Sequence, residues 1–129
     1  MTDAGSLLQR AREAAKSAYA PYSKFRVGAA VLAGGSVFTG CNVENASYGL
    51  TICAERNAMF QAVAAGYRRI DALALVCVDV AIDGPAKLRM PCGACRQVMA
   101  EFGTDDLPIE IDGVGVFRLA DLLPSAFSL

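Results

Sequence analysis

The strongest constraint on this chain is a set of three cysteines at the starts of two helical segments, in a sequence without histidine. Cys53 opens Cys53-Ala54-Glu55, and Cys92 and Cys95 follow in Pro91-Cys92-Gly93-Ala94-Cys95. Without imidazole, the Ser/His/Asp and Cys/His catalytic systems are excluded, as is every zinc site with a histidine ligand. Three thiols on one zinc ion leave its fourth tetrahedral position open, which marks a catalytic rather than a structural site.

The placement of these cysteines favours the thiolate form, which is the form that binds metal ions. We expect Cys53 in the first turn of one helix, with Cys92 and Cys95 flanking the first turn of the next. A helix N-terminus presents unpaired N–H groups and positive potential, which lower the pKa of a thiol. Cys41 and Cys77 lie in apolar strands, and we expect both to be buried free cysteines.

A carboxylate, Glu55, follows the first of these cysteines by two residues. On the same helix turn it can exchange protons with a water in the open position without being a ligand. A glutamate that only interacts with the helix dipole is the alternative. Arg56 is placed to donate hydrogen bonds to ligand sulfurs, unless it is an ordinary solvated arginine, and Gln97 is a second candidate for such a contact.

Hydrophobic periodicity and turn residues predict an α/β fold with the element order α-β-β-α-β-α-β-β. Helices are expected over 5–19, 52–65 and 93–102, with a short one over 119–123, and strands over 27–33, 36–41, 70–80, 109–111 and 114–117. The pair of strands around Gly34-Gly35 has the pattern of a hairpin. Because helices connect the later strands, we expect a three-layer α-β-α structure with a mixed sheet of about five strands.

Length and composition narrow the class of protein. The length of 129 residues predicts one domain, 1–129. Apolar residues make up 54% of the chain and charged residues 19%, which favours a homo-oligomer over a monomer with an alanine-rich core. A net charge of −1, with no basic run beyond Arg68-Arg69, argues against nucleic acid as a partner. We expect no signal peptide and no membrane partner, and five cysteines without an export signal point to reduced thiols and the cytoplasm.

Sequence motifs of a more specific kind occur along nearly the whole chain. They are the segments Tyr19–Phe25 (YAPYSKF), Val27–Ala30 (VGAA), Gly40–Asn45 (GCNVEN), Tyr48–Arg56 (YGLTICAER), Pro91–Gln97 (PCGACRQ) and Leu122–Phe127 (LLPSAF). With them the chain resembles the small homotetrameric, Cys₃-zinc type of cytidine deaminase, within the cytidine/deoxycytidylate deaminase superfamily. The CAE and PCxxC motifs alone indicate only the superfamily, whereas the Asn-x-Glu pair and the closing LLPxxF indicate the nucleoside branch.

The resemblance implies a cytidine-deaminase-like fold, one Zn²⁺ per subunit and specific residue roles. By motif, the zinc ligands are Cys53, Cys92 and Cys95, and the proton shuttle is Glu55. Asn42 and Glu44 are implied to bind the ribose hydroxyls, and Phe25 and Ala54 to contact the substrate. Phe127 is implied to reach the base in a neighbouring subunit's site, with Tyr48 near that interface. Without the resemblance, Asn42 and Glu44 are plain loop residues, and Phe25 and Phe127 plain core. Met90 and Asn57 depart from the family pattern, which has a small polar residue and Thr at these places.

The reaction that the resemblance implies is zinc-dependent hydrolytic deamination of cytidine and 2′-deoxycytidine to the uracil nucleosides and ammonia, a step of pyrimidine salvage. One alternative keeps the chemistry but takes another aminopyrimidine nucleoside, as the related blasticidin-type deaminases do. A structural zinc module, with Cys41 or Cys77 as fourth ligand, is an alternative of another class. A dithiol redox protein that uses Cys92 and Cys95 is the last, and it leaves Cys53 and Glu55 without a role.

Overall fold

A mixed sheet of five strands forms the middle layer of the computed structural model, which describes residues 4–129. The strands are β1 (Val27–Ala33), β2 (Ser36–Cys41), β3 (Ala72–Cys77), β4 (Pro108–Ile111) and β5 (Gly115–Arg118), in the spatial order β2-β1-β3-β4-β5. All neighbours are antiparallel except β3 and β4, which are parallel. This one parallel pair follows from its helical crossover, because a chain that returns through a helix enters the sheet in the same direction.

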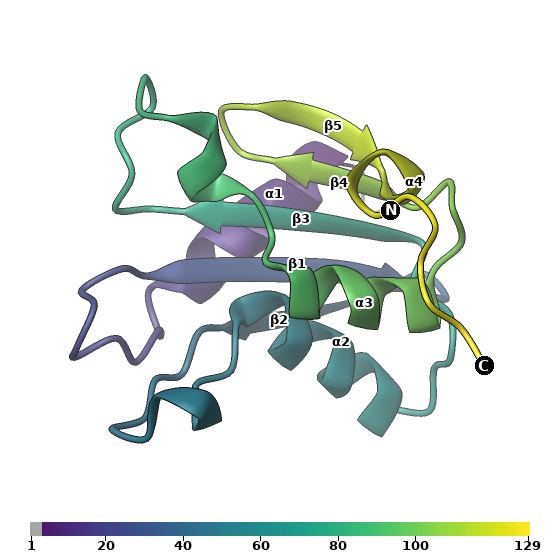
Figure 1. Cartoon of the computed structure of the whole chain (residues 1–129), viewed down its shortest axis with the longest axis horizontal. Helices are drawn as coiled ribbons and strands as arrows, with labels where there is room; N and C mark the ends of the chain where they lie inside the picture. The colour runs from purple at the N-terminus through teal and green to yellow at the C-terminus, as the bar shows by residue number, and fades with distance from the viewer. Residues whose placement is uncertain (1–3) are drawn as a thin grey trace.

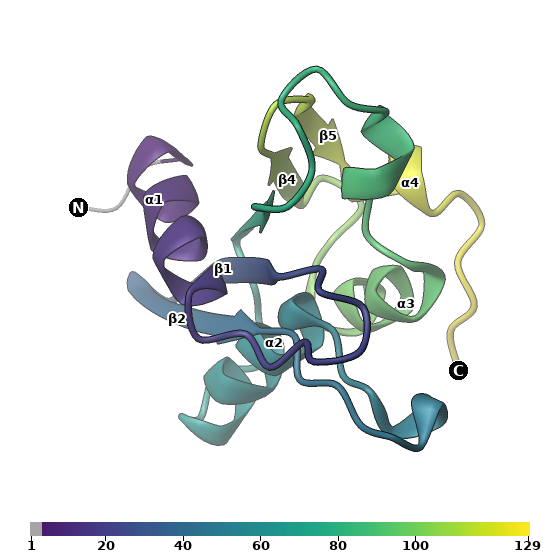
Figure 2. The ribbon, with the colours of Figure 1, turned by 90° about the vertical axis from the view of Figure 1, so that its left-hand side faces the viewer.

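Helices cover both faces of this sheet (Figures 1 and 2). α1 (Ala4–Ala15) lies on one face, while α2 (Ala54–Ala64) and α3 (Gly93–Phe102) lie on the other. A short α4 (Leu119–Leu122) follows β5, and two 3₁₀ helices, η1 (Tyr48–Leu50) and η2 (Ala86–Arg89), lie in the connections. The predicted three-layer fold is confirmed. In the described part of the chain, 4–129, no helix combines the length and apolarity needed to cross a membrane.

The alternation of side chains along β3 divides the core into two parts. Leu73 and Leu75 point into the larger cluster beneath α2 and α3, whereas Ala74 and Val76 pack towards α1. Direct backbone contact fixes α2 on β2 at Gly40, because a Cβ atom there would lie 2.7 Å from the carbonyl oxygen of Ala54. The first turn of α2 is therefore held tightly against the sheet.

One helix and one strand end earlier in the structure than the sequence pattern predicts. The helix expected over 5–19 ends at Ala15, because Tyr19 pairs with the segment of Asn42 and Glu44. The strand expected over 70–80 ends at Cys77, because Asp79 turns away to accept hydrogen bonds from the backbone and guanidinium of Arg26. Both departures depend on partners that are distant in the sequence.

Candidate active site

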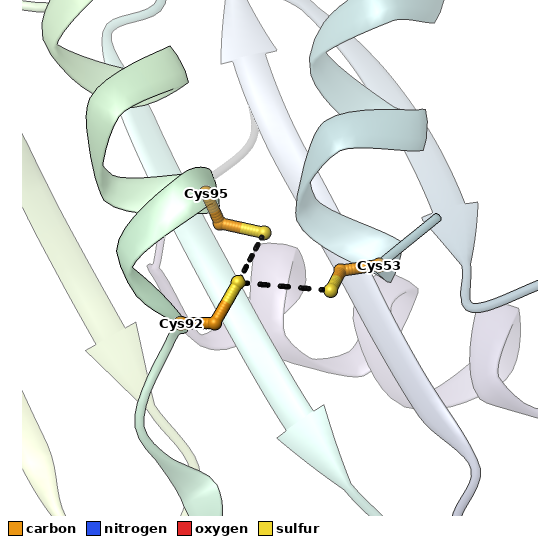
Figure 3. A group of neighbouring side chains, drawn as sticks. All are labelled: Cys53, Cys92 and Cys95. Atoms are coloured by element: carbon orange, nitrogen blue, oxygen red, sulfur yellow. Dashed lines mark hydrogen bonds between the residues drawn. The ribbon is translucent and has the colours of Figure 1, made fainter. Parts of the chain in front are cut away.

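The N-termini of α2 and α3 bring three thiols together. Cys53 and Cys92 occupy the N-cap positions of the two helices, and Cys95 lies in the first turn of α3. Their sulfur atoms all lie within 4.8 Å of one another, with Cys92 Sγ 3.8 Å from that of Cys53 and 3.4 Å from that of Cys95. Figure 3 shows the three side chains pointing towards a common centre.

This donor set fits zinc. Thiolate sulfur is a preferred zinc ligand, and three ligands leave one tetrahedral position for water or substrate. Among the residues that the structure describes, the cluster includes neither Cys41 nor Cys77, so a closed four-cysteine site lacks its fourth thiol. The geometry therefore favours the catalytic type of site over the structural zinc module.

Hydrogen bonds stabilise the charged form of the first thiol. The pKa of Cys53 is lowered to about 5, first by a hydrogen bond with the Cys95 thiol and further by Arg56. Nη2 of Arg56 donates to Cys53 Sγ at 3.5 Å, and this contact with the thiolate raises the pKa of the guanidinium. Arg56 thus donates the hydrogen bond to a cysteine sulfur that its position in the sequence predicts.

Glu55 is a buried carboxylate beside the thiols, with 4% of its surface exposed. Burial is the largest cause that raises its pKa, to about 7, and the charge of Cys53 adds to this effect. A group with this pKa accepts and releases protons readily near neutral pH. Ala54, which is fully buried, lies next to it in the wall of the same cavity.

A cavity of about 720 Å³ connects the thiols to the surface. Its inner end is formed by buried residues that include Glu55, Leu75 and Cys77, and its mouth by exposed residues such as Tyr22 and Tyr48. This volume is in the range of small-molecule sites. Within the part of the chain that the structure describes, no Lys or Arg lines it.

Asn42 and Glu44 line the cavity, and both are held by backbone contacts. The Asn42 amide donates to the carbonyl oxygen of Phe25 at 2.7 Å and accepts from the N–H of Val27 at 2.9 Å. An amide nitrogen carries two hydrogens, so one remains for a ligand. Phe25 itself lines the cavity beside them.

Ser23 is a site residue that the sequence did not single out, although it lies within the quoted motif of residues 19–25. Its hydroxyl donates to Oε2 of Glu44, while the N–H groups of Tyr22 and Ser23 donate to Oε1 at 3.0 and 3.1 Å. The hydrogen bond from Ser23 is the main cause that lowers the pKa of Glu44. Glu44 is therefore ionised at neutral pH.

Two further cavity features were not predicted. Cys77 is buried as expected, with 8% exposure, yet its thiol lines the cavity. Burial raises its pKa to about 12, so it is an uncharged part of the wall. Leu88 and Met90 form another part of the wall, on the connection between β3 and α3. Met90 was noted only as a departure from the family pattern before the PCxxC motif, and Leu88 lies in no motif, so the sequence did not predict either residue in the wall.

The C-terminal segment lies apart from this cavity. The Phe127 side chain is 70% exposed, and it lines a separate groove along α3 and α4. The Gln97 amide, for which the sequence favours a contact with a ligand sulfur, donates instead to the carbonyl oxygen of Phe127 at 2.9 Å. Gln97 lies on α3 beyond the thiols and holds the C-terminal segment against that helix.

Known proteins resemble this chain over nearly its whole length. A family model described as the cytidine and deoxycytidylate deaminase zinc-binding region matches residues 1–111. Cytidine deaminases of Mycobacterium tuberculosis and Sporosarcina psychrophila are 50% and 46% identical to the chain, over 98% of its length and 91% and 92% of theirs. The crystal structure of cytidine deaminase from Burkholderia pseudomallei is 47% identical and superimposes with a TM-score of 0.85, over 98% of this chain and 100% of that one. With a zinc-binding family model over most of the sequence and such identity across whole chains, this protein belongs to the cytidine and deoxycytidylate deaminase family.

Proposed function

We propose that residues 1–129 form one zinc-dependent deaminase domain that converts cytidine and 2′-deoxycytidine to uridine and 2′-deoxyuridine, with release of ammonia. The observation that carries the proposal is a buried carboxylate, Glu55, beside three convergent thiols at the inner end of a cavity. Relatives at 46% and 50% identity that are named cytidine deaminases support the choice of substrate. Such an enzyme serves pyrimidine salvage.

Cys53, Cys92 and Cys95 would hold the zinc ion, which when bound supplies a Lewis acid that makes water nucleophilic near neutral pH. Arg56 offsets the excess negative charge of three thiolates through its hydrogen bond to Cys53. Glu55 accepts a proton from the attacking water and delivers it to N3 of the base. It then carries the proton of the new C4 hydroxyl to the amine, which leaves as ammonia.

The lining of the cavity favours a nucleoside over a nucleotide. A phosphate group would meet the ionised Glu44 and find no Lys or Arg among the described residues of the wall. Asn42 and Glu44 are the polar groups that fit ribose hydroxyls, and Phe25 offers an apolar surface for the base. A ribose contact of this kind is also what separates cytidine from substrates without a sugar.

The proposed enzyme is a homotetramer, and exposed aromatic side chains support contact between its subunits. Tyr48 at the mouth of the cavity is 90% exposed and Phe127 is 70% exposed. Such surfaces in a single chain favour burial against another subunit. In the proposed assembly, Phe127 of one subunit completes the base pocket of its neighbour.

Replacement of the proton shuttle tests the reaction. Glu55→Gln removes the proton carrier with little change in shape, so we expect zinc to remain bound while deamination falls at least about a hundredfold. The measurement is the loss of cytidine absorbance in the ultraviolet, combined with metal analysis. Glu101→Gln, at an exposed position of α3, is the matched control and should keep wild-type activity. Wild-type turnover by zinc-loaded Glu55→Gln would overturn the assignment.

A further inference from the structure

A buried arginine lies behind the wall of the cavity, in η2. Arg89 is only 3% exposed. Its Nη1 donates to the carbonyl oxygen of Asp112 at 3.1 Å, and its Nη2 donates to the carbonyl oxygen of Ala81. Burial of a guanidinium is unfavourable unless its donors find partners, and Nε of Arg89 has none among the described residues. The two carbonyl acceptors are therefore the polar contacts that determine where this side chain lies.

The two acceptors belong to different parts of the fold. Asp112 lies between β4 and β5, where its N–H donates to Leu75 at 3.0 Å and its carboxylate pairs with Arg12 of α1 at 2.8 Å. It is therefore fixed to the sheet and to a helix. Ala81 lies in the irregular connection of residues 78–92, and its carbonyl oxygen also accepts from Gly84 at 2.7 Å. Arg89 thus attaches this connection to the rigid part of the molecule.

The turn beside Asp112 leaves the space that the guanidinium fills. Gly113 has a φ of +78°, a conformation that disfavours side chains. A Cβ atom at this position would lie 1.8 Å from Nη1 of Arg89. A side chain at residue 113 is thus incompatible with the observed place of Arg89.

The neighbours of Arg89 in sequence, Leu88 and Met90, both line the cavity. Pro91, which lies between Met90 and Cys92, is held by another arginine. Nε of Arg96 donates to the carbonyl oxygen of Pro91 at 2.8 Å, and its Nη1 donates to that of Leu122 at 2.7 Å. Loss of the Arg89 contacts would therefore release the wall of the cavity, while Arg96 still holds the backbone that precedes Cys92.

We infer that Arg89 is a positioning residue for substrate binding: it holds Leu88 and Met90 in the wall by joining residues 78–92 to the turn at Asp112. The inference rests on the proposed function in one respect, because the nucleoside is taken as the molecule that fills the cavity. It predicts that loss of the Arg89 contacts weakens substrate binding without changing the zinc content or the rate of the chemical step.

The test is Arg89→Met, which keeps the length of the side chain but removes its donors. We expect KM for cytidine to rise about tenfold or more, with kcat within about twofold of wild type and unchanged zinc content. Amide hydrogen exchange over residues 78–92 should become faster. Arg118→Met is the matched control, since exposed Arg118 pairs with Asp106 and neither residue lines the cavity, and it should leave KM and exchange unchanged.

Gly113→Ala disturbs the same contact, because its Cβ atom would collide with Nη1 of Arg89. It should raise KM as well, and the double variant with Arg89→Met should show less than the product of the two effects. An unchanged KM in Arg89→Met, or a parallel loss of zinc and kcat at constant KM, would overturn the inference. If Arg89→Met does not fold, Arg89→Lys is measured in the same way. A single ammonium group does not reproduce the two hydrogen bonds of the guanidinium, so the same changes in KM and amide exchange are expected.

Failure of the proposed function would be seen separately. In that case the wild-type protein does not deaminate cytidine, and amide exchange decides alone. Faster exchange over residues 78–92 in Arg89→Met than in Arg118→Met would support the positioning role, and equal exchange would exclude it.

Discussion

At the scale of single residues, Ser23 connects the side chain of Glu44 with the backbone of Phe25, two residues of the cavity. Its hydroxyl donates to Glu44 and accepts from the N–H of Phe25 at 3.0 Å. The same hydroxyl therefore orients the carboxylate proposed for the ribose and the backbone of the aromatic proposed for the base. A carboxylate that is already aligned loses little freedom when a ligand binds.

Removal of Glu44 should discriminate between substrates. We expect Glu44→Ala to lower kcat/KM for cytidine about tenfold or more, and to have little effect on free cytosine if cytosine reacts measurably, because only the nucleoside has ribose hydroxyls. Steady-state kinetics on both compounds measure the difference. Equal losses on cytidine and cytosine would assign Glu44 a structural role.

Ser23→Ala serves as the companion variant in the same assay. It should give a smaller loss on cytidine than Glu44→Ala, since two backbone N–H groups still hold the carboxylate. In the Glu44→Ala background, Ser23→Ala should add little, because its main partner is absent. Full additivity of the two changes would show that Ser23 does not act through Glu44.

The sequence predicts a functional residue where the residue type is rare in the chain and its spacing to other such residues is specific. Three cysteines and Glu55 in a chain without histidine restrict the chemistry before any fold is known. Ser23 and Arg89 could not be found in this way. Their partners, Glu44 and Asp112, are 21 and 23 residues away, and serine and arginine are common on loops and surfaces.

At the scale of elements, two helix N-termini form the site together. Cys53 and Cys92 are the N-cap residues of α2 and α3, so the positive ends of both helices face the thiols. The hydrophobic runs predicted these helices and all five strands, within a few residues at most ends. The order β2-β1-β3-β4-β5 was not predictable, because antiparallel pairing of β1 with β3 depends on contacts 40 to 50 residues apart.

The metal content tests this arrangement of helices. Purified protein should hold about one zinc ion per chain, and Cys92→Ala should lose most of it, because two thiols are a weak site for zinc. Cys41→Ala is the matched control, since Cys41 closes β2 outside the cluster, and it should keep its zinc. Metal analysis of the three single variants at Cys53, Cys92 and Cys95 checks the assignment. Full zinc content in all of them would disprove it.

At the scale of the whole molecule, the distribution of apolar side chains points beyond one subunit. Among the described residues, the buried core contains no Phe or Tyr, and apolar side chains that include Tyr48, Leu50, Val116 and Phe127 are exposed. Tyr48 lies at the mouth of the cavity, whereas Phe127 lies at a separate groove of the same chain. In the proposed assembly, a second subunit would bring this aromatic to a neighbouring active site.

Phe127→Ala should weaken cytidine binding while zinc content and fold are preserved, because the 70% exposed side chain contributes little to its own subunit. Stacking on a base contributes on the order of 1 kcal/mol beyond burial, so KM should rise about fivefold or more. Ser128→Ala, at the next position, is the control and should leave KM unchanged.

Mixed oligomers show which subunit supplies the aromatic. Glu55→Gln lacks the proton shuttle but offers an intact Phe127, and Phe127→Ala has the shuttle but not the aromatic. When the two variants are refolded together, some sites should combine Glu55 of one chain with Phe127 of the other. The activity of the mixture at low cytidine should then exceed the average of the two parents. If mixed oligomers form, as mass spectrometry can verify, and activity only equals that average, Phe127 does not complete a neighbouring site.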